Sequence, residues 1–380
     1  NVISNQGVGT YIEHARNDFY SQVFNIDHKG AYKNDLFTLK WGARYQRQYF
    51  DDFVNEWEMV DSAGFSLPHP ADSIGSPNPP HPLFEIQHLS KGHNVLNINN
   101  IDGFVHNEWT FNTKNADILT LSLGIRANYW GYNNEVNISP RAGLAYKPSW
   151  NNDMLFRLSG GVYVQPPFYR ELRMFDGSLV KPENATTQKS YQVVLTHEYN
   201  FIAWDRPFVL TSELYYKYLK DIIPYEVDNI RIRYYADQKA TGYATGLDVR
   251  VNGEFVKGID SWASVSIMKS AENIKYYLSP TGNILSQTQI DNGAEYVCDT
   301  IIRGIPRPSD QRINFSLFFQ DYLPYIPSFK VNLKMIFGTG MPFGTPYGER
   351  YTQKMRMSAY RRVDIGFSKQ LISETTSFKK

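Results

Sequence analysis

Residues 118–130 decide the fold class of this chain, and they read ILTLSLGIRANYW. Every second residue from Leu119 to Tyr129 is apolar or aromatic, whereas the residues between them are polar or glycine. Because a β-strand points successive side chains to opposite faces, this segment would present one apolar face and one polar face. The pattern predicts an amphipathic strand over residues 118–130.

The same alternation recurs along the chain, and the 3.6-residue period of helices is almost absent. Residues 244–255 and 360–369 repeat it most clearly. About fourteen antiparallel strands are therefore predicted, and the fold class is all-β. They are expected near residues 20–30, 36–50, 101–112, 118–130, 137–147, 155–164, 187–199, 208–219, 230–236, 244–255, 261–270, 311–320, 329–338 and 360–369.

Short and long connections alternate along this series of strands. The short ones carry the Asn, Asp, Gly or Pro that tight turns require, and lie at residues 113–117, 148–153, 200–207, 256–260 and 321–328. Long loops are expected near residues 51–99, 165–186, 271–311 and 340–359. The alternation indicates a sheet with tight turns at one end and loops at the other. Barrels of the outer membrane have this asymmetry, with their long loops outside the cell.

The composition excludes several other classes of protein. The chain has 380 residues, a formal net charge of +1 and a mean hydropathy of −0.44. So small a charge creates no field that would gather nucleic acid, and no nucleic-acid partner is expected. Cys298 is the one cysteine, which excludes a disulfide-stapled module. No apolar run reaches the ~18 residues of a spanning helix, but a spanning strand needs only ~9–11 alternating residues.

Alternation alone is also typical of a soluble sandwich with one buried face. Three features favour a membrane barrel. Many expected strands reach ten residues, whereas ordinary strands average ~5–6. The apolar face is sustained through the series, and aromatic residues such as Trp109 and Phe111 gather at strand ends, where a membrane barrel has its aromatic girdles. The chain starts at Asn1 without a methionine or signal-peptide pattern, so we expect a fragment or a processed chain.

Specific strings add a family resemblance to this pattern. Residues 139–148 (SPRAGLAYKP), 155–163 (LFRLSGGVY) and 166–172 (PPFYREL) resemble the mid-barrel hairpin and loop of TonB-dependent outer-membrane receptors. Residues 338–346 (GTGMPFGTP) and 360–369 (YRRVDIGFSK) are similar to a late loop and strand of that family. The order and spacing of the strings over 137–369 carry the resemblance.

The resemblance implies a transmembrane up-and-down barrel of 22 strands around an N-terminal plug domain. About fourteen of those strands are expected in residues 1–380, which would make the barrel domain partial and incomplete at both ends. The implied function is import of a scarce nutrient: an iron chelate, a cobalamin-like compound, an oligosaccharide or a peptide. The implied partners are the lipid bilayer, the protein's own plug, the TonB complex reached through an N-terminal part, and a surface lipoprotein as a further candidate.

Candidate ligand-binding residues lie in the expected long loops. Half of the eight histidines fall in residues 51–99, and imidazole coordinates metals and metal chelates. The surrounding prolines favour histidines that are simply solvated, and their spacing matches no standard site, so no metal site is assigned. Aromatic residues there could stack on a sugar or a catechol, or pack against one another. The candidates are Trp57, His69, His81, His88, His93, Phe168, Tyr169, Arg170, Tyr276 and Tyr277.

Charged residues on the polar side of the strands are the second candidate set. In a barrel they would face the lumen, where mixed charge suits a water-filled wall; alternatively they would dock the plug or guide an anionic substrate. The residues are Lys40, Arg44, Arg126, Arg157, Asp248, Arg250, Glu254, Arg312 and Asp364.

No catalytic motif is present: the chain lacks GxSxG, HExxH and a phosphate-binding glycine loop between a strand and a helix. The protein is therefore not expected to be an enzyme, and no cofactor is expected. Two rivals to the receptor remain open. One is a passive channel or fatty-acid-type barrel. The other is a soluble extracellular β-rich binding protein, whose alternating faces would be buried against a second sheet.

Overall fold

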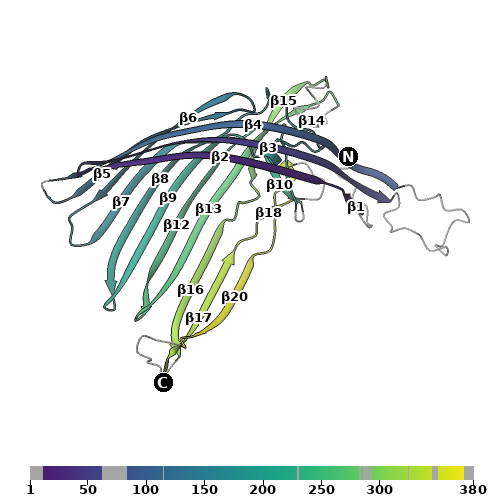
Figure 1. Ribbon diagram of the computed structural model, residues 1–380. Coiled ribbons are helices and arrows are strands. Elements are labelled where there is room, and N and C mark those ends of the chain that lie inside the picture. Colours follow the sequence, from purple (N-terminus) through teal and green to yellow (C-terminus); the bar gives the residue numbers. More distant parts are fainter. Residues whose placement is uncertain are drawn as a thin grey trace, which may run out of the picture.

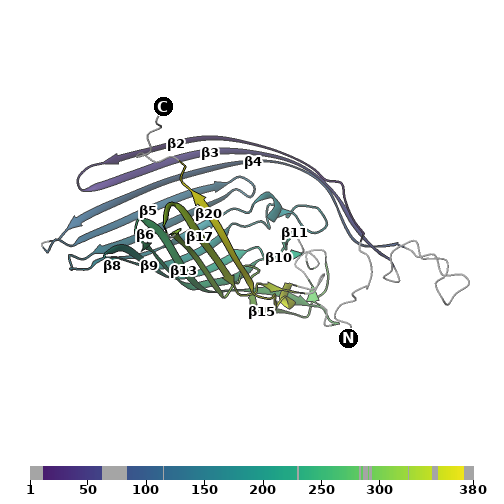
Figure 2. The same ribbon diagram turned by 90° about the horizontal axis from the view of Figure 1, so that it is seen from below.

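One large antiparallel sheet dominates the structure, a computed structural model. The residues it describes are 12–61, 84–113, 115–228, 231–281, 284–285, 290, 293–323, 325–344 and 350–371. Sixteen strands of this part of the chain belong to the sheet, and they run side by side in a curved surface (Figures 1 and 2). The predicted all-β fold is confirmed.

The bounds of the elements are as follows. The sheet contains β1 (Ile12–Ala15), β2 (Asp18–Lys33), β3 (Phe37–Asp61), β4 (Phe84–Asn112), β5 (Ile118–Trp130), β6 (Glu135–Lys147), β7 (Asp153–Gln165), β8 (Gln188–Ala203), β9 (Arg206–Ile222), β12 (Ala240–Val256), β13 (Ile259–Leu278), β14 (Ile284–Leu285), β15 (Cys298–Pro306), β16 (Ile313–Leu323), β17 (Ile326–Gly338) and β20 (Tyr360–Lys369). Two small hairpins and two short 3₁₀ turns lie in the loops: β10 (Tyr225–Asp228) with β11 (Arg231–Tyr234), β18 (Pro342–Phe343) with β19 (Met355–Arg356), η1 (Tyr169–Leu172) and η2 (Arg350–Thr352).

The sheet has up-and-down topology. Each long strand pairs with the next long strand in the chain, from β3 through β9, β12, β13, β16 and β17 to β20. Strands β1 and β2 pair with successive parts of β3, and within the described residues they form one edge of the sheet while β20 forms the other. Nothing in the described part of the chain forms a helix that is long and apolar enough to cross a membrane.

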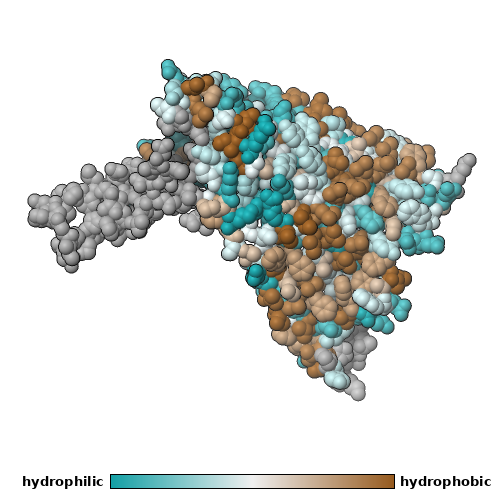
Figure 3. Space-filling model, turned by 180° about the vertical axis from the view of Figure 1, so that it is seen from behind, coloured by the Kyte–Doolittle hydropathy of each residue, from teal (hydrophilic) through white to brown (hydrophobic). Residues whose placement is uncertain are grey.

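The register sorts side chains onto two faces, because residues that oppose one another across a ladder point the same way. Leu247 opposes Leu214 on one neighbour and Ile267 on the other, and all three are exposed. Their face is called the apolar face, and Figure 3 shows large apolar areas on the surface of the molecule. The opposite, polar face carries Asp248 and Ser266. Within the described residues no second large sheet covers the apolar face, contrary to the soluble alternative.

The ends of the sheet differ as the sequence predicts. The turns after β4, β6, β8, β12 and β16 are short, and all five fall within the segments expected to be short. Longer connections follow β3, β7, β9, β13 and β17 at the other end, which is called the loop end. The connection after β5 is a four-residue turn at the loop end.

The prediction of a long loop at residues 51–99 is wrong over most of that range. Strand β3 continues to Asp61 and β4 begins at Phe84, and the two are paired from Phe37 opposite Trp109 to Asp61 opposite Phe84. These strands extend beyond the band of apolar residues. There neither face needs to be apolar, so the period-two signal disappears although the strand continues.

Two further expectations are corrected by the structure. Residues 230–236 do not form a strand of the large sheet; β11 pairs only with β10 in a local hairpin, and β12 joins β9 directly. The expected loop 271–311 is partly strand, because β13 reaches Leu278 and β15 pairs with its outer half. Alternation identifies strands, but it cannot tell a strand of the large sheet from a hairpin within a loop.

Candidate functional site

The connection after β7 folds back onto the polar face at the loop end. Its short turn η1 is capped by Glu171, whose Oε2 accepts a hydrogen bond of 2.9 Å from the Phe168 N–H. The Tyr169 hydroxyl donates a hydrogen bond of 2.7 Å to Asp52 Oδ2 on β3. The Arg173 guanidinium donates to the same oxygen at 3.3 Å. Burial and the neighbouring Asp52 carboxylate raise the pKa of Tyr169, so its hydroxyl stays a donor.

A second attachment holds the tip of this loop on β4. The Lys91 N–H donates to the Asp176 carbonyl at 2.8 Å, and the Asn94 side-chain amide donates to the Gly177 carbonyl at 2.8 Å. Gly177 has a φ of +90°, and a Cβ there would lie 3.0 Å from backbone atoms of Lys91. Glycine is thus required both by the conformation and by the close approach.

Apolar residues of the loop complete the attachment. Leu172, Val180 and Ala185 pack with Ile98 of β4 and Trp130 of β5 in one buried cluster. Ile98 and Trp130 lie in register with polar-face positions, so this small core lies on the polar side of the sheet. The loop therefore covers part of the polar face at the loop end.

A pocket of about 250 Å³, called the loop pocket, opens beside this loop. Its lining comes from β1, the ends of β3 and β4, the loop after β7 and the hairpin β10–β11. The lining residues are His14, Ala15, Asn17, Glu56, Trp57, Ser90, Arg170, Arg173, Met174, Phe175, Ile232, Arg233 and Tyr234. Segments that are far apart in sequence thus meet at one site.

The chemistry of the loop pocket is basic and aromatic. Three arginines, Arg170, Arg173 and Arg233, contribute to its wall. Arg173 is engaged with Asp52, whereas Arg170 is exposed and has no ion pair among the described residues. Trp57 stacks on the His14 ring with 5.2 Å between ring centroids. Guanidinium groups bind carboxylate and phosphate oxygens, and an indole offers a stacking surface, so the pocket suits an anionic group attached to a planar or apolar body.

The structure brings together only part of the first candidate set. Trp57 and Arg170 line the loop pocket, and Phe168 lies exposed at the start of η1. Tyr169 is buried and anchors the loop. His93 lies on β4, where its Nε2 is 2.9 Å from Asp51 Oδ1.

The other members of that set lie elsewhere. His88 lies on β4, and His69 and His81 fall outside the described residues. Tyr276 and Tyr277 belong to β13 rather than to a loop. Tyr276 is buried beside Ile274 and Ile305 in a separate cluster, so its ring is not available to a ligand, and Tyr277 packs on Tyr296.

Sequence reasoning missed several lining residues, among them Arg173, Arg233 and Tyr234. Arg170 lies in the 3₁₀ turn η1, and Arg173 is the residue directly after that turn. The turn therefore keeps both arginines near the pocket. The sequence predicts residues 230–236, and with them Arg233 and Tyr234, as a strand of the sheet. Their contribution depends on where the hairpin β10–β11 packs, for which the sequence has no local signal.

The second candidate set lies mostly on the polar face. Arg44 lies opposite Asp102 in the register, and Arg126 forms an ion pair with Asp102 on the same face. Ladder partners place Arg157, Asp248 and Asp364 on that side too. Lys40 and Arg250 share that face. Glu254 lies near a short turn, where it accepts a hydrogen bond from the Gly258 N–H. Arg312 lies at the loop end. That this face lines a lumen stays a prediction.

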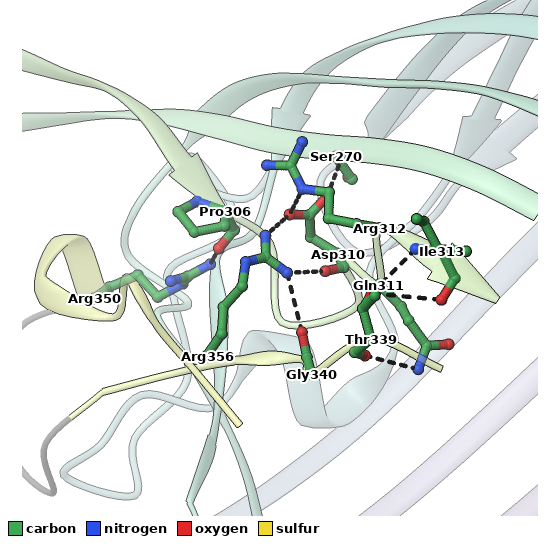
Figure 4. A network of polar contacts seen from close by, with 10 residues as sticks. All are labelled: Ser270, Pro306, Asp310, Gln311, Arg312, Ile313, Thr339, Gly340, Arg350 and Arg356. Carbon is green, nitrogen blue, oxygen red and sulfur yellow. Dashed lines mark hydrogen bonds and ion pairs between the residues drawn. The ribbon is translucent and has the colours of Figure 1, made fainter. Parts of the chain in front are cut away.

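Buried ion pairs tie the loops after β13 and β17 together. Arg350 Nη2 lies 2.9 Å from Glu272 Oε1, and both side chains are fully buried. Asp310, also buried, lies 2.9 Å from Arg312 Nε and forms a second ion pair with Arg356 (Figure 4). Within the described residues no group of three or more His, Cys, Asp or Glu side chains could hold a metal ion.

Comparison with known proteins agrees with this architecture. The family description "TonB dependent receptor-like, beta-barrel" matches residues 2–376. No curated protein matches the chain. Among solved structures it is similar to the siderophore receptor PiuA from Acinetobacter baumannii, with 12% identity and a TM-score of 0.53 over 94% of this chain and 50% of that one. It is also similar to the copper transporter OprC, with 11% identity and a TM-score of 0.53 over 94% of this chain and 49% of that one.

The outer membrane transporter YddB from Escherichia coli is a third such structure, with 12% identity and a TM-score of 0.52 over 92% of this chain and 47% of that one. At these identities the likeness concerns the fold. The chain spans about half the length of each of these three structures.

Proposed function

Because the chain belongs to the TonB-dependent receptor β-barrel family, we propose that it forms part of the barrel of a receptor that imports a scarce nutrient with energy from a TonB complex. The family places the protein in the outer membrane as a β-barrel and makes it a transport protein rather than an enzyme. The plug domain and the TonB complex are proposed partners, and a surface lipoprotein is a further candidate.

The loop pocket is the observation that carries the proposal. In a barrel with short turns toward the periplasm, the loop end faces the outside, where a nutrient arrives. The pocket opens at that end and is built by loops and strand extensions. Arg170 offers a guanidinium that no described residue neutralises, which favours a ligand with an anionic group. Of the ligand classes that the family suggests, an anionic iron chelate or a peptide carboxylate suits this chemistry best.

Uptake by cells that carry the full-length protein tests the proposal. Cells would be supplied with radiolabelled ferric citrate, cyanocobalamin, maltohexaose or tetra-alanine, with and without a protonophore. We expect accumulation of an anionic ligand that stops when the protonophore removes the energy for TonB. Uptake that continues without energy would favour the passive channel, and recovery of the protein in the soluble fraction would contradict the membrane assignment.

A substitution in the pocket makes the test specific. Replacing Arg170 with glutamine removes a charge-assisted hydrogen bond, so uptake at low ligand concentration should fall by about 10-fold. Lys181→Gln removes an exposed charge from the same loop outside the pocket and serves as the control. Equal uptake by the two variants would exclude the loop pocket as the ligand site.

A further inference from the structure

Three methionines share one face of the hairpin β18–β19 at the loop end. Phe343 opposes Met355 and Pro342 opposes Arg356, and the Met357 N–H donates to the Met341 carbonyl at 3.0 Å, which continues the ladder by one pair. Met341 and Met357 are thus direct partners, and Met355 lies two residues from Met357 on the same side. Cβ atoms of opposed residues lie about 4.5–5.5 Å apart, so the long side chains of this methionine cluster can converge.

The other face of the hairpin is fixed to the protein. Arg356 points away from the methionine cluster, since residues 355 and 357 alternate with it. Its guanidinium forms an ion pair with Asp310 and donates to the carbonyls of Asp310 at 2.8 Å and Gly340 at 3.1 Å (Figure 4). These contacts hold the backbone, so the three thioethers are presented on an anchored ribbon.

The methionine cluster is unusual in its exposure. Met341, Met355 and Met357 are 47%, 47% and 52% exposed, although methionine is an apolar residue that ordinarily fills gaps in cores. They are three of the eight methionines in the chain. Within the described residues they belong to neither of the two buried clusters, so core packing does not explain them.

We propose that the methionine cluster is a binding site for Cu(I), with the three thioether sulfurs as ligands. Thioether sulfur is a soft, neutral donor, and soft donors select Cu(I) over hard cations such as Mg²⁺ and Ca²⁺. Three exposed methionine side chains on one face of a ribbon leave the outward side open, so the ion can enter directly from solvent. The guanidinium of Arg356 lies on the opposite face, where it forms an ion pair with Asp310, so it does not face the ion. The site is separate from the loop pocket and does not depend on which nutrient is imported.

Cu(I) titration of the full-length protein in detergent tests the proposal. Copper would be kept reduced with ascorbate in the absence of oxygen, and bicinchoninate would compete for it. All samples would carry Cys298→Ser, because the exposed thiol of Cys298 is another soft donor. The test variant combines Met341→Leu, Met355→Leu and Met357→Leu, since leucine keeps an apolar side chain of similar volume but lacks sulfur. Met335→Leu on β17 is the control for a methionine outside the cluster.

We expect the parent and the Met335→Leu protein to bind one equivalent of Cu(I) that the triple variant does not bind. Each single substitution in the cluster should weaken binding by at least about 10-fold, since even indirect partners of a metal contribute 10- to 100-fold. X-ray absorption of the copper-loaded parent should show sulfur as the nearest neighbour. The proposal is overturned if the parent does not bind Cu(I), or if the triple variant, shown by its heat-modifiable migration to be folded, binds it equally well.

Discussion

The Tyr169 hydroxyl donates a hydrogen bond of 2.7 Å to the carboxylate of Asp52, a residue 117 positions earlier in the chain. Asp52 is only 2% exposed, so this contact joins a loop residue to a buried acceptor on the polar face of β3. Phe50 stacks on the Tyr169 ring with 4.9 Å between centroids, on the same side of the strand. The position of the loop after β7, and with it one wall of the loop pocket, depends on this pair.

Replacing Tyr169 with phenylalanine should loosen that loop without unfolding the sheet. The ring keeps its stacking, but Asp52 loses its closest donor and, among the described residues, retains Arg173, at a cost of about 1–2 kcal/mol. Hydrogen exchange of residues 168–180 should become faster, while exchange in β5 should stay slow. Tyr191→Phe, which removes a hydroxyl from the apolar face, is the control. Unchanged exchange in 168–180 would show that the hydrogen bond does not hold the loop.

Gly177 provides a second test of how the loop is attached. Its φ of +90° makes alanine unfavourable by about 1–2 kcal/mol, and the added Cβ would also lie 3.0 Å from the Lys91 backbone. Gly293 has nearly the same φ, +91°, but nothing lies within 4 Å of its Cβ position. Gly177→Ala should therefore increase protease cleavage in the loop after β7 more than Gly293→Ala increases cleavage near residue 293. Equal effects would mean that conformation alone, and not the contact with β4, requires glycine.

The strands that cross the apolar band could be predicted closely from sequence. The sequence predicts strands at residues 118–130 and 360–369, and β5 and β20 have these same bounds. Within the band one face must be apolar while the other stays polar, so the alternation is strict. Outside it that requirement ends, which is why the extension of β3 to Asp61 and of β13 to Leu278 could not be recognised.

The candidate site could be predicted only in part, because local sequence does not show which distant segments pack together. Trp57 and Arg170 stand out because aromatic and arginine residues in loops are common ligand contacts. Arg233 lines the pocket because the hairpin β10–β11 packs there. Tyr276 is buried because β15 and η2 cover it. These outcomes depend on tertiary packing between segments that are far apart in sequence.

The Glu272–Arg350 pair should be sensitive to the loss of either charge. Both side chains are fully buried, and removing one partner of such a pair leaves an uncompensated charge that costs about 3–5 kcal/mol. Glu272→Gln should therefore release the connection after β17, seen as faster hydrogen exchange in residues 350–357. Exchange in β17 itself should change little, because its ladders with β16 and β20 remain intact.

A double substitution separates charge from packing at the same place. Glu272→Met with Arg350→Met removes both charges and keeps apolar volume, so it should restore much of the protection that Glu272→Gln removes. Arg307, the second arginine near Glu272, is partly accessible to water. If the double variant exchanges as fast as Glu272→Gln, relieving the uncompensated charge does not restore the loop, and the direct contact between Glu272 and Arg350 is what holds it.

The assignment of the apolar face to lipid predicts opposite outcomes for two neighbouring positions. Leu247 lies on the apolar face of β12, and Ser266 on β13 lies on the polar face opposite Asp248. An arginine on the lipid side of a barrel strand costs about 2–4 kcal/mol near the middle of the bilayer, whereas an arginine on the polar side stays hydrated. The full-length Leu247→Arg protein should therefore insert poorly, giving little heat-modifiable band after refolding into lipid vesicles, while Ser266→Arg should insert almost normally. The reverse result would mean that the faces are assigned the wrong way round, and equal insertion would show that Leu247 does not meet the lipid interior.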